Sequence, residues 1–363
     1  MDINPRRLVG IQPERVTNVS NTEFPGHYPD EDHSWDLHKF RESLKVRVQR
    51  LSRRSIEFDV VGIDASIANA FRRIMIAEVP TVAIEDVYVF NNTSIVQDEV
   101  LSHRIGLVPL NINPTKIDTK EPGEQATDRN TLEFKIDMEC KHNPAFNKSS
   151  LTTNPTPSDK DLYINHELLS SHLVWQPVGE QEERFANYPV KPINPNIVLA
   201  KLRPGQAVNM TLHAVKGIGS DHAKFSPVAT ATYRLHPNIV ITKMIPFERA
   251  EQFAACFSKG VVKIDERNRK CTVSIDPHHL RNDTVSREVL RHPEFAESVA
   301  LSRIRDHFIF SVESESAYPP EQLLVEAVNV MHEKITAMKN AALALLNGGI
   351  GVAEGDVLMQ NAP

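Results

Sequence analysis

The stretch GIDASIANAFRRIMIAEVP, residues 62–80, decides the fold of this chain because it predicts a helix with apolar side chains on two sides. Asp64 is a residue type that caps helix N-termini, and Pro80 disfavours helical angles at the residue before it, so the helix runs between them. One apolar stripe follows the helical spacing and consists of Ile67, Ala70, Phe71, Ile74 and Met75. Ile76 lies on the opposite side. Such a helix needs a second apolar surface, which another chain can provide.

A second amphipathic helix is predicted between Pro320 and Gly348. Proline suits the first helical position, and glycine suits the C-terminal cap. The apolar residues between them alternate in spacing between four and three: Leu324, Val328, Met331, Ile335, Met338, Ala342 and Leu345. This is a heptad seam of about three heptads, which is the lower limit for a coiled coil. The helix either lies on its own domain or faces a partner, and we favour the partner.

The charge balance argues against a protein that grips nucleic acid. The 363 residues include 41 basic and 47 acidic side chains, which gives a formal net charge of -6. Proteins that hold a phosphate backbone normally show a basic excess or a basic stripe. Short basic clusters, such as the one from Arg47 to Arg54, are typical of solvated strand faces and turns. We therefore expect little or no direct contact with DNA.

Cysteine usage and hydropathy indicate the compartment. Cys140, Cys256 and Cys271 are widely spaced and form no C-x-x-C motif. This usage is typical of a reducing compartment and argues against a disulfide framework or a cysteine-rich zinc site. The N-terminus lacks the apolar core of a signal peptide, and no apolar run approaches the length of a membrane span. We expect a soluble intracellular protein that does not contact a membrane.

Strand patterns and a helix occur near both ends of the chain, and a long mixed region separates them. Alternating apolar residues predict a hairpin from residues 44–48 and 56–60. A second hairpin is predicted from residues 197–202 and 207–215, joined by the type II turn Arg203-Pro-Gly-Gln206. Because the early and late segments both need a partner, a discontinuous domain with an inserted domain explains this order most simply.

Several short motifs resemble nucleotide-binding or metal-binding sites, but each lacks residues that such a site requires. The Gly217–Pro227 loop, GIGSDHAKFSP, lacks the third glycine of a dinucleotide fingerprint and the G-K-[ST] of a P-loop. A tight loop that joins domains is favoured over a nucleotide site. Candidate metal ligands lack a second ligand pair or a turn to position them: Asp30, Asp32, Asp36, Cys140, His142, His278 and His279. These residues assemble no catalytic apparatus.

Several blocks in a fixed order resemble the alpha-like subunits of cellular RNA polymerases. They are ANAFRRIMIAEVP at 68–80, QDEVLSHRIGLVPL at 97–110, GSDHAKFSP at 219–227 and FIFSVES at 308–314. The resemblance extends from about Asn18 to Lys339. Two further blocks, LAKLRPGQ at 199–206 and DTVSREVLR at 283–291, resemble the type that eukaryotic RNA polymerases I and III share.

The resemblance implies an α+β fold, in which a discontinuous alpha-like dimerisation domain carries an inserted mixed α/β domain and a small ferredoxin-like insertion lacking a metal cluster. The implied boundaries are an extended N-terminal arm over 1–41, a dimerisation domain over 42–88, 228–236 and 305–346, an inserted domain over 89–227, the ferredoxin-like insertion over 237–304 and a flexible tail over 347–363. The equivalent polymerase II subunit carries a zinc loop, and some archaeal relatives hold an iron–sulfur cluster. Here only Cys256 and Cys271 lie in the insertion and no cysteine lies near Asn91, so we expect no metal and no cofactor.

The resemblance also implies a non-catalytic assembly subunit. Such a subunit pairs with a smaller alpha-like subunit, and the heterodimer is the platform for the two largest polymerase subunits and other subunits of RNA polymerases I and III. Their transcription of rRNA, tRNA and 5S RNA places the subunit in the nucleus, including the nucleolus.

The two apolar helices agree with this role, because two helices from each partner would form a shared four-helix core. The residues that we expect at this interface are Ile67, Phe71, Ile74, Met75, Leu324, Val328, Met331, Ile335 and Met338. Two alternatives are a homodimeric scaffold that uses the same seam and a nucleotide-binding enzyme that uses the Gly217–Pro227 loop.

Overall fold

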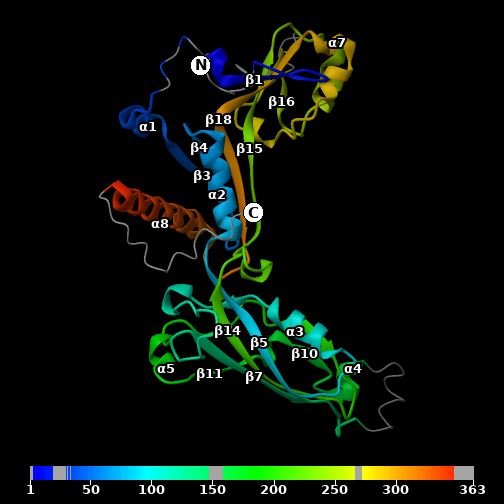
Figure 1. Ribbon diagram of the computed structural model, residues 1–363. Helices are drawn as coiled ribbons and strands as arrows, with labels where there is room; N and C mark the ends of the chain where they lie inside the picture. Colours follow the sequence, from blue (N-terminus) through cyan, green and yellow to red (C-terminus); the bar gives the residue numbers. More distant parts are fainter. Residues whose placement is uncertain are drawn as a thin grey trace. The chain divides into compact units, whose positions relative to one another are not determined.

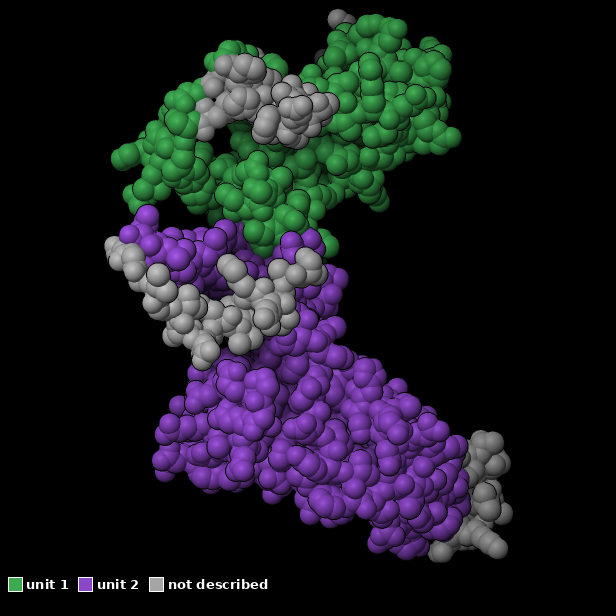
Figure 2. All heavy atoms as spheres, viewed as in Figure 1, with its two compact units in different colours: residues 1–70, 232–312 green, residues 71–231, 313–363 purple. Residues whose placement is uncertain are grey.

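The computed structural model describes residues 3–18, 30, 32, 34–146, 158–265 and 272–346. Within these residues the fold is mixed α+β, and the strand pairs of known register are antiparallel. The chain divides into two compact units, residues 1–70 with 232–312 and residues 71–231 with 313–363 (Figure 2). Each unit is therefore built from two separate parts of the chain. The tail predicted over 347–363 lies outside the described residues.

The first unit is built around a large sheet. Its strand order is β2 (Val16–Thr17), β1 (Leu8–Ile11), β18 (Val299–Ser314), β4 (Ser55–Val61) and β3 (Lys45–Leu51). The long strand β15 (Val228–Ile241) also pairs with β18, and the two run side by side in Figure 1. The predicted hairpin of β3 and β4 is confirmed, with Val46 opposite Val60 and Val48 opposite Phe58.

The N-terminal segment, which we predicted as an extended arm, begins with strands that join this sheet. Strand β1 pairs antiparallel with β18, and Leu8 lies opposite Ile304. The Arg7 guanidinium donates to Asp306 Oδ1 at 2.8 Å. Residues 8–11 form a strand because they are apolar and favour β structure. The run is short and has polar residues on both sides, so the sequence pattern did not predict it. The segment ends in the helix α1 (Leu37–Ser43).

Residues between β15 and β18 pack around an apolar core that they share with β1, β15 and β18. They form α6 (Ala250–Ala255), β16 (Val262–Asp265), β17 (Thr272–Ile275), α7 (Pro293–Ala296) and the 3-10 turns η6 (Phe247–Arg249), η8 (Leu280–Asn282) and η9 (Glu288–Arg291). Strands β16 and β17 pair antiparallel. The buried core includes Phe253, Phe295, Val261 and Val289, and the rings of Phe253 and Phe295 meet edge to face.

A buried group of charged and polar side chains ties η8 to strand β4. The Arg281 guanidinium donates to Glu57 Oε1 at 2.9 Å and to Asp59 Oδ1 at 3.1 Å. Gln49 Nε2 donates to Asp59 Oδ2 at 2.7 Å, and His307 Nε2 lies 3.6 Å from the same oxygen. Burial alone would raise the pKa of Asp59, but His307, Arg281 and Gln49 together hold this pKa below its usual range. Asp59 is therefore a buried carboxylate whose charge depends on its partners.

The second unit contains a four-stranded antiparallel sheet in the order β11 (Val174–Gln176), β7 (Thr131–Glu139), β14 (Ala207–Gly217) and β5 (Thr81–Asn92). Smaller strand pairs are β10 (Glu167–Leu169) with β13 (Val198–Lys201), β12 (Lys191–Pro192) with β6 (Leu110–Asn111), and β8 (Lys141–His142) with β9 (Tyr163–Ile164). Its short helices are α3 (Asp98–Gly106), α4 (Asp159–Leu162) and α5 (Gln181–Arg184). The core of this unit includes Phe134, Ile84, Leu101 and Met210.

The second predicted hairpin is wrong in its pairing but right in its turn. Gly205 has a φ of +87°, and the Gln206 amide donates to the Arg203 carbonyl at 2.9 Å, as a type II turn requires. The strands on either side do not pair with each other: β13 pairs with β10, whereas β14 lies between β5 and β7. The turn is set by local residues, but the partners of the eleven-residue strand β14 come from distant parts of the chain.

Both long helices predicted from the sequence are present as α2 (Ala65–Ala77) and α8 (Pro320–Leu346). Asp64 caps α2, because its carboxylate accepts from the Ser66 amide at 2.8 Å. Among the described residues, no helix combines the length and the apolar content that crossing a bilayer requires.

The substitution Arg281→Ala is expected to lower the free energy of unfolding by about 3 kcal/mol, because it leaves the Asp59 carboxylate buried without its cation. The matched control Arg291→Ala removes an arginine whose side chain is 75% exposed, and we expect a change below about 1 kcal/mol. Urea denaturation followed by circular dichroism measures both. Equal losses in the two variants would contradict the role given to the buried cluster.

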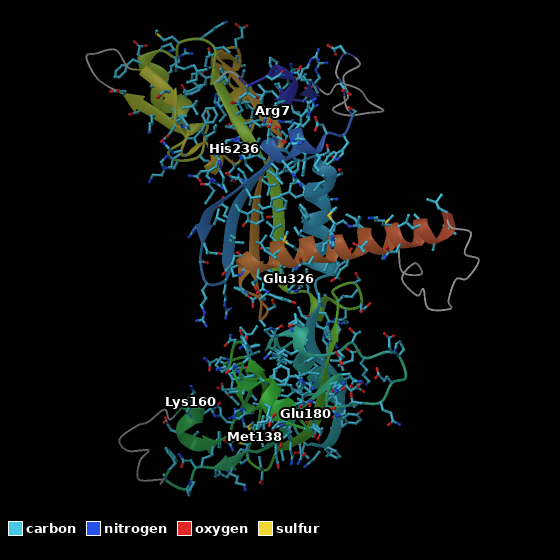
Figure 3. All side chains as sticks on the ribbon, turned by 90° about the vertical axis from the view of Figure 1, so that its left-hand side faces the viewer. Arg7, Met138, Lys160, Glu180, His236 and Glu326 are labelled. Atoms are coloured by element: carbon cyan, nitrogen blue, oxygen red, sulfur yellow. The ribbon has the colours of Figure 1, made fainter. Side chains whose placement is uncertain are left out.

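The same region predicts a loss of stability in acid. His236 lies on β15 (Figure 3), and its ring stacks on that of His307 with centroids 4.4 Å apart. Burial lowers the pKa of His236 from 6.5 to about 4, and the His307 ring acts in the same direction. Between these pH values the unfolded chain binds the proton more readily, so the free energy of unfolding falls as the pH drops from 6.5 towards 4.

We expect this loss to be on the order of 2 to 3 kcal/mol and to be smaller in His236→Gln, which has no proton to bind. Urea denaturation of both proteins at pH 7.5 and pH 5 makes the comparison. An identical pH dependence in the two proteins would refute the assignment to His236.

Candidate dimerisation surface

Helix α8 is covered by its own chain at one end and exposed at the other. Pro320, Leu323 and Ala327, which lie on one face of its first turns, are buried. From His332 to Leu346 every residue is exposed. The N-terminal half therefore anchors the helix, and the C-terminal half presents its surface to whatever binds there.

The heptad seam predicted on α8 is accessible. Met338 is 67% exposed, Ile335 54% and Val328 46%, while Leu324 and Met331 are partly exposed. Large apolar side chains that are exposed in a row are typical of a protein interface. The structure adds Val325, Leu343 and Leu346, which are also exposed and lie outside the predicted set. They lie off the alternating spacing of four and three residues that selected the predicted seam.

The residues of helix α2 that we predicted for the interface fall into two groups, one partly exposed and one buried. Ile67 and Phe71 are partly exposed, so a partner can reach them. Ile74 and Met75 are 5% and 0% exposed, so they belong to the interior of the chain itself. Ala68 is also fully buried and lies on the same side of the helix as Met75, and Val79, just beyond the helix end, is fully buried as well. The predicted stripe is thus wide enough to contact the chain's own core along one edge and to leave the other edge open.

The Gly217–Pro227 loop holds the C-terminal end of α2. The Ser220 amide and hydroxyl both donate to the Ala77 carbonyl, at 2.8 and 3.0 Å. These bonds satisfy one of the carbonyls that every helix leaves free at its C-terminus. A Cβ at Gly219 would lie 2.4 Å from the Ile76 carbonyl oxygen, so only glycine allows this approach. The loop therefore has a structural task at the end of the helix.

The same loop is not arranged as a phosphate cradle. The Lys224 ammonium donates to the Ile84 carbonyl at 2.9 Å and forms an ion pair with Glu85. Its side chain is largely buried, and it lies over the Phe225 ring. Because this cation already has partners within the chain, the nucleotide-binding alternative finds no support in the geometry.

Strand β3 offers an uncovered apolar surface that sequence reasoning did not select. Val46 and Val48 are exposed, yet they lie on the same face of the sheet as the buried residues Val60 and Phe58 opposite them. Their alternation with polar residues was visible in the sequence. The alternation could not reveal whether another element covers Val46 and Val48. Among the described residues, these two valines stay exposed.

The structure also places the candidate metal ligands. Among the described residues, no three histidine, cysteine or acidic side chains lie close enough together to hold a metal ion. Cys140 and Cys256 are buried free thiols whose pKa values are raised by burial. Cys271 lies outside the described residues. Asp30, Asp32 and Asp36 lie within them, where Asp30 pairs with Arg6 and the Asp36 carboxylate caps α1 by accepting from the His38 amide.

Comparison with known proteins agrees with an assembly surface. Residues 57–335 match a family described as the RNA polymerase Rpb3/Rpb11 dimerisation domain. This match covers most of the chain, includes the whole of α2 and ends within α8.

Three relatives span nearly the whole chain. The Saccharomyces cerevisiae protein named DNA-directed RNA polymerases I and III subunit RPAC1 is 47% identical over 340 residues, which cover 93% of this chain and 98% of the yeast protein. The Homo sapiens protein of the same name is 45% identical over 88% of this chain and 90% of its own length. DNA-directed RNA polymerases II, IV and V subunit 3 of Arabidopsis thaliana is 29% identical over 81% and 90%, respectively.

The loop that ends α2 gives a prediction about stability. Gly219→Ala is expected to lower the free energy of unfolding by about 2 kcal/mol or more, because its Cβ would overlap backbone atoms that cannot move freely. Gly106→Ala is the control, since a Cβ there meets the Ile84 carbonyl oxygen at the milder distance of 3.3 Å. Thermal unfolding of both variants measures the difference. A Gly219 variant as stable as the control would show that the close approach is unimportant.

Proposed function

The chain belongs to the family of the RNA polymerase Rpb3/Rpb11 dimerisation domain, and we propose that it is a non-catalytic structural subunit of DNA-directed RNA polymerases I and III. Its similarity to the subunits named for these two polymerases covers 90% or more of their length and supports this function. The lower identity to subunit 3 of polymerases II, IV and V favours the I and III type. In this proposal, catalysis of RNA synthesis lies in other subunits.

The partner that we propose is the smaller alpha-like subunit of the same polymerases. The observation that carries this proposal is the exposed apolar seam of α8. Val328, Ile335 and Met338 all occupy positions of this seam and are exposed. Ile67 and Phe71 on α2 supply further exposed apolar area. Two such helices from each subunit would bury on the order of 2,000 Å² or more, as obligate interfaces do.

The heterodimer would serve as the platform on which the two largest subunits assemble for transcription of rRNA, tRNA and 5S RNA. The proposed location is therefore the nucleus, including the nucleolus. The formal net charge of -6 supports a role in which other subunits contact the DNA.

We also retain the proposed domain organisation within this function. The apolar core formed mainly by residues 239–301, together with Ile11 of β1, supports a small insertion, for which a ferredoxin-like fold remains a prediction. The apolar core that runs from Val82 to Ala214 supports an inserted domain over about 89–227. The remaining segments, which include α2 and α8, would form the discontinuous dimerisation domain.

A homodimer is the second candidate, because an exposed heptad seam can also pair with its own copy. The mass of the chain expressed alone, measured by light scattering, separates the two. A stable, folded dimer of this single chain would favour the homodimer. A monomer or an aggregate that becomes soluble with the smaller subunit would favour the heterodimer.

The substitution Met338→Asp is expected to abolish the heterodimer, because an unpaired charge in a desolvated seam costs several kcal/mol. Co-expression with the smaller alpha-like subunit, followed by size-exclusion chromatography, measures the loss.

The matched control is Asn340→Asp, which adds the same charge to the same exposed turn on the opposite side of the helix. We expect this variant to keep the complex. A complex that survives Met338→Asp as well as it survives Asn340→Asp would exclude the seam as the interface.

A further inference from the structure

The loop after strand β5 displays two large apolar side chains to solvent in the second unit. Ile95 at the loop is 85% exposed, and Phe90 near the end of the strand is 71% exposed. Tyr88, on the same strand, is 49% exposed. We call Phe90 and Ile95 the knob. They lie apart from α8 in the sequence, and the dimerisation seam does not account for them.

The loop that carries Ile95 is held by a dense set of hydrogen bonds. The Asn92 side-chain amide donates to the Val96 carbonyl at 3.0 Å and to Asp98 Oδ1 at 2.6 Å. Its carbonyl oxygen accepts from the Ser94 amide at 3.1 Å and from the Ser94 hydroxyl at 2.7 Å. The Val96 amide donates to Ser94 Oγ at 3.2 Å. The side chains of Asn92 and Ser94 therefore fix the loop on both sides of Ile95.

Phe90 is placed by an irregularity of the sheet. The pairing of β14 with β5 shifts register between Asn209 and Met210, so that Asn209 lies opposite Asn91 and Met210 opposite Val89. Phe90 is the extra residue, as in a β-bulge, and bulges commonly redirect a side chain. At the loop end, the Thr93 amide donates to the Ala207 carbonyl at 3.0 Å, and the Ala207 amide donates to Thr93 Oγ1 at 2.8 Å. Strand β14 therefore anchors the backbone on both sides of Phe90 and as far as Thr93.

A preorganised loop that exposes large apolar side chains has the properties of a binding anchor. Exposing an isoleucine and a phenylalanine forfeits the free energy that burying each side chain in a core would gain. A loop already fixed in one conformation loses little entropy when a partner binds it. Aromatic anchors that enter a pocket dominate protein interfaces.

The charges around the knob select the kind of partner. Asp86 on β5 forms an ion pair with Lys120 at 3.7 Å, and residues 93–97 of the loop itself carry no charge. Asp98 and Glu99 lie in the first turn of α3, directly after the loop. Acidic groups beside the knob repel a phosphate backbone and an anionic lipid surface, so nucleic acid and membrane are disfavoured. They fit an apolar pocket whose rim carries lysine or arginine.

We propose that the knob docks into an apolar, basic-rimmed pocket on another protein subunit, distinct from the dimerisation partner. This inference rests on the proposed function, because the partner is sought within the polymerase assembly. The knob would be a second point of attachment, independent of the α8 seam.

The test uses the full-length tagged chain, assembled with polymerase subunits in cells and purified. Ile95→Asp and Phe90→Asp are each compared with Val174→Asp, which alters an exposed valine on β11 of the same unit. The amount of every subunit relative to the tagged chain is measured by quantitative mass spectrometry. We expect the knob variants to lose one subunit at least about tenfold while the dimerisation partner and the Val174 control are unchanged.

A photo-crosslinking residue in place of Ile95 tests the contact without relying on a destabilising change. The expected adduct lies on the lost subunit, within a few residues of a lysine or arginine, and Glu99→Lys should reduce it about threefold or more. Adducts only to nucleic acid or lipid, an adduct in an acidic segment, or full retention of every subunit would overturn the inference. If the unaltered chain captures no polymerase subunit, the proposed function itself fails. If the unaltered chain and the knob variants capture the polymerase subunits equally, the proposed function stands and only the docking role of the knob is refuted.

Discussion

The uncovered apolar stripe on α8 is the constraint from which the proposed role of this chain follows. Leu323 and Ala327 anchor the first half of the helix, but every residue from His332 to Leu346 is exposed. An isolated helical segment of this length is marginal in water, and each Å² of apolar surface left exposed forfeits about 25 cal/mol of burial free energy. A partner that covers the seam would therefore stabilise the helix and gain binding energy from the same side chains.

The second helix shows how a scaffold keeps such a surface in place. Met75 and Val79 are buried, which fixes the position of α2, and the Ser220 amide and hydroxyl both bond the carbonyl of its last residue, Ala77. The Gly217–Pro227 loop, whose glycines resemble those of a phosphate site, thus holds the end of α2. Rigid seating matters for assembly, because a preformed surface loses less conformational entropy when it binds. The same reasoning applies to the hydrogen-bonded loop that carries Ile95.

The sequence was sufficient for features that depend on local residues. Asp64, Pro80 and Pro320 placed both long helices, and the Pro-Gly pair at 204–205 placed its turn. The sequence was insufficient where a strand pairs with a distant part of the chain. Strand β14 pairs with β5 and β7 rather than with its neighbour in the chain, β13. Periodicity identified the apolar face of α2 but could not show that Ile74 and Met75 are covered by the chain itself. The bonds of Asn92 that fix the knob depend on backbone geometry, which residue types alone do not reveal.

Amide hydrogen exchange of residues 332–346 tests the central claim most directly. The exchange is measured in the chain alone and in its complex with the smaller alpha-like subunit, with strands β7 and β14 as an internal reference. We predict fast exchange of the helix in the free chain and a slowing of about tenfold or more in the complex, while the reference strands do not change. Exchange of this segment that is equally slow in both states, or equally fast in both, would contradict a seam that a partner covers.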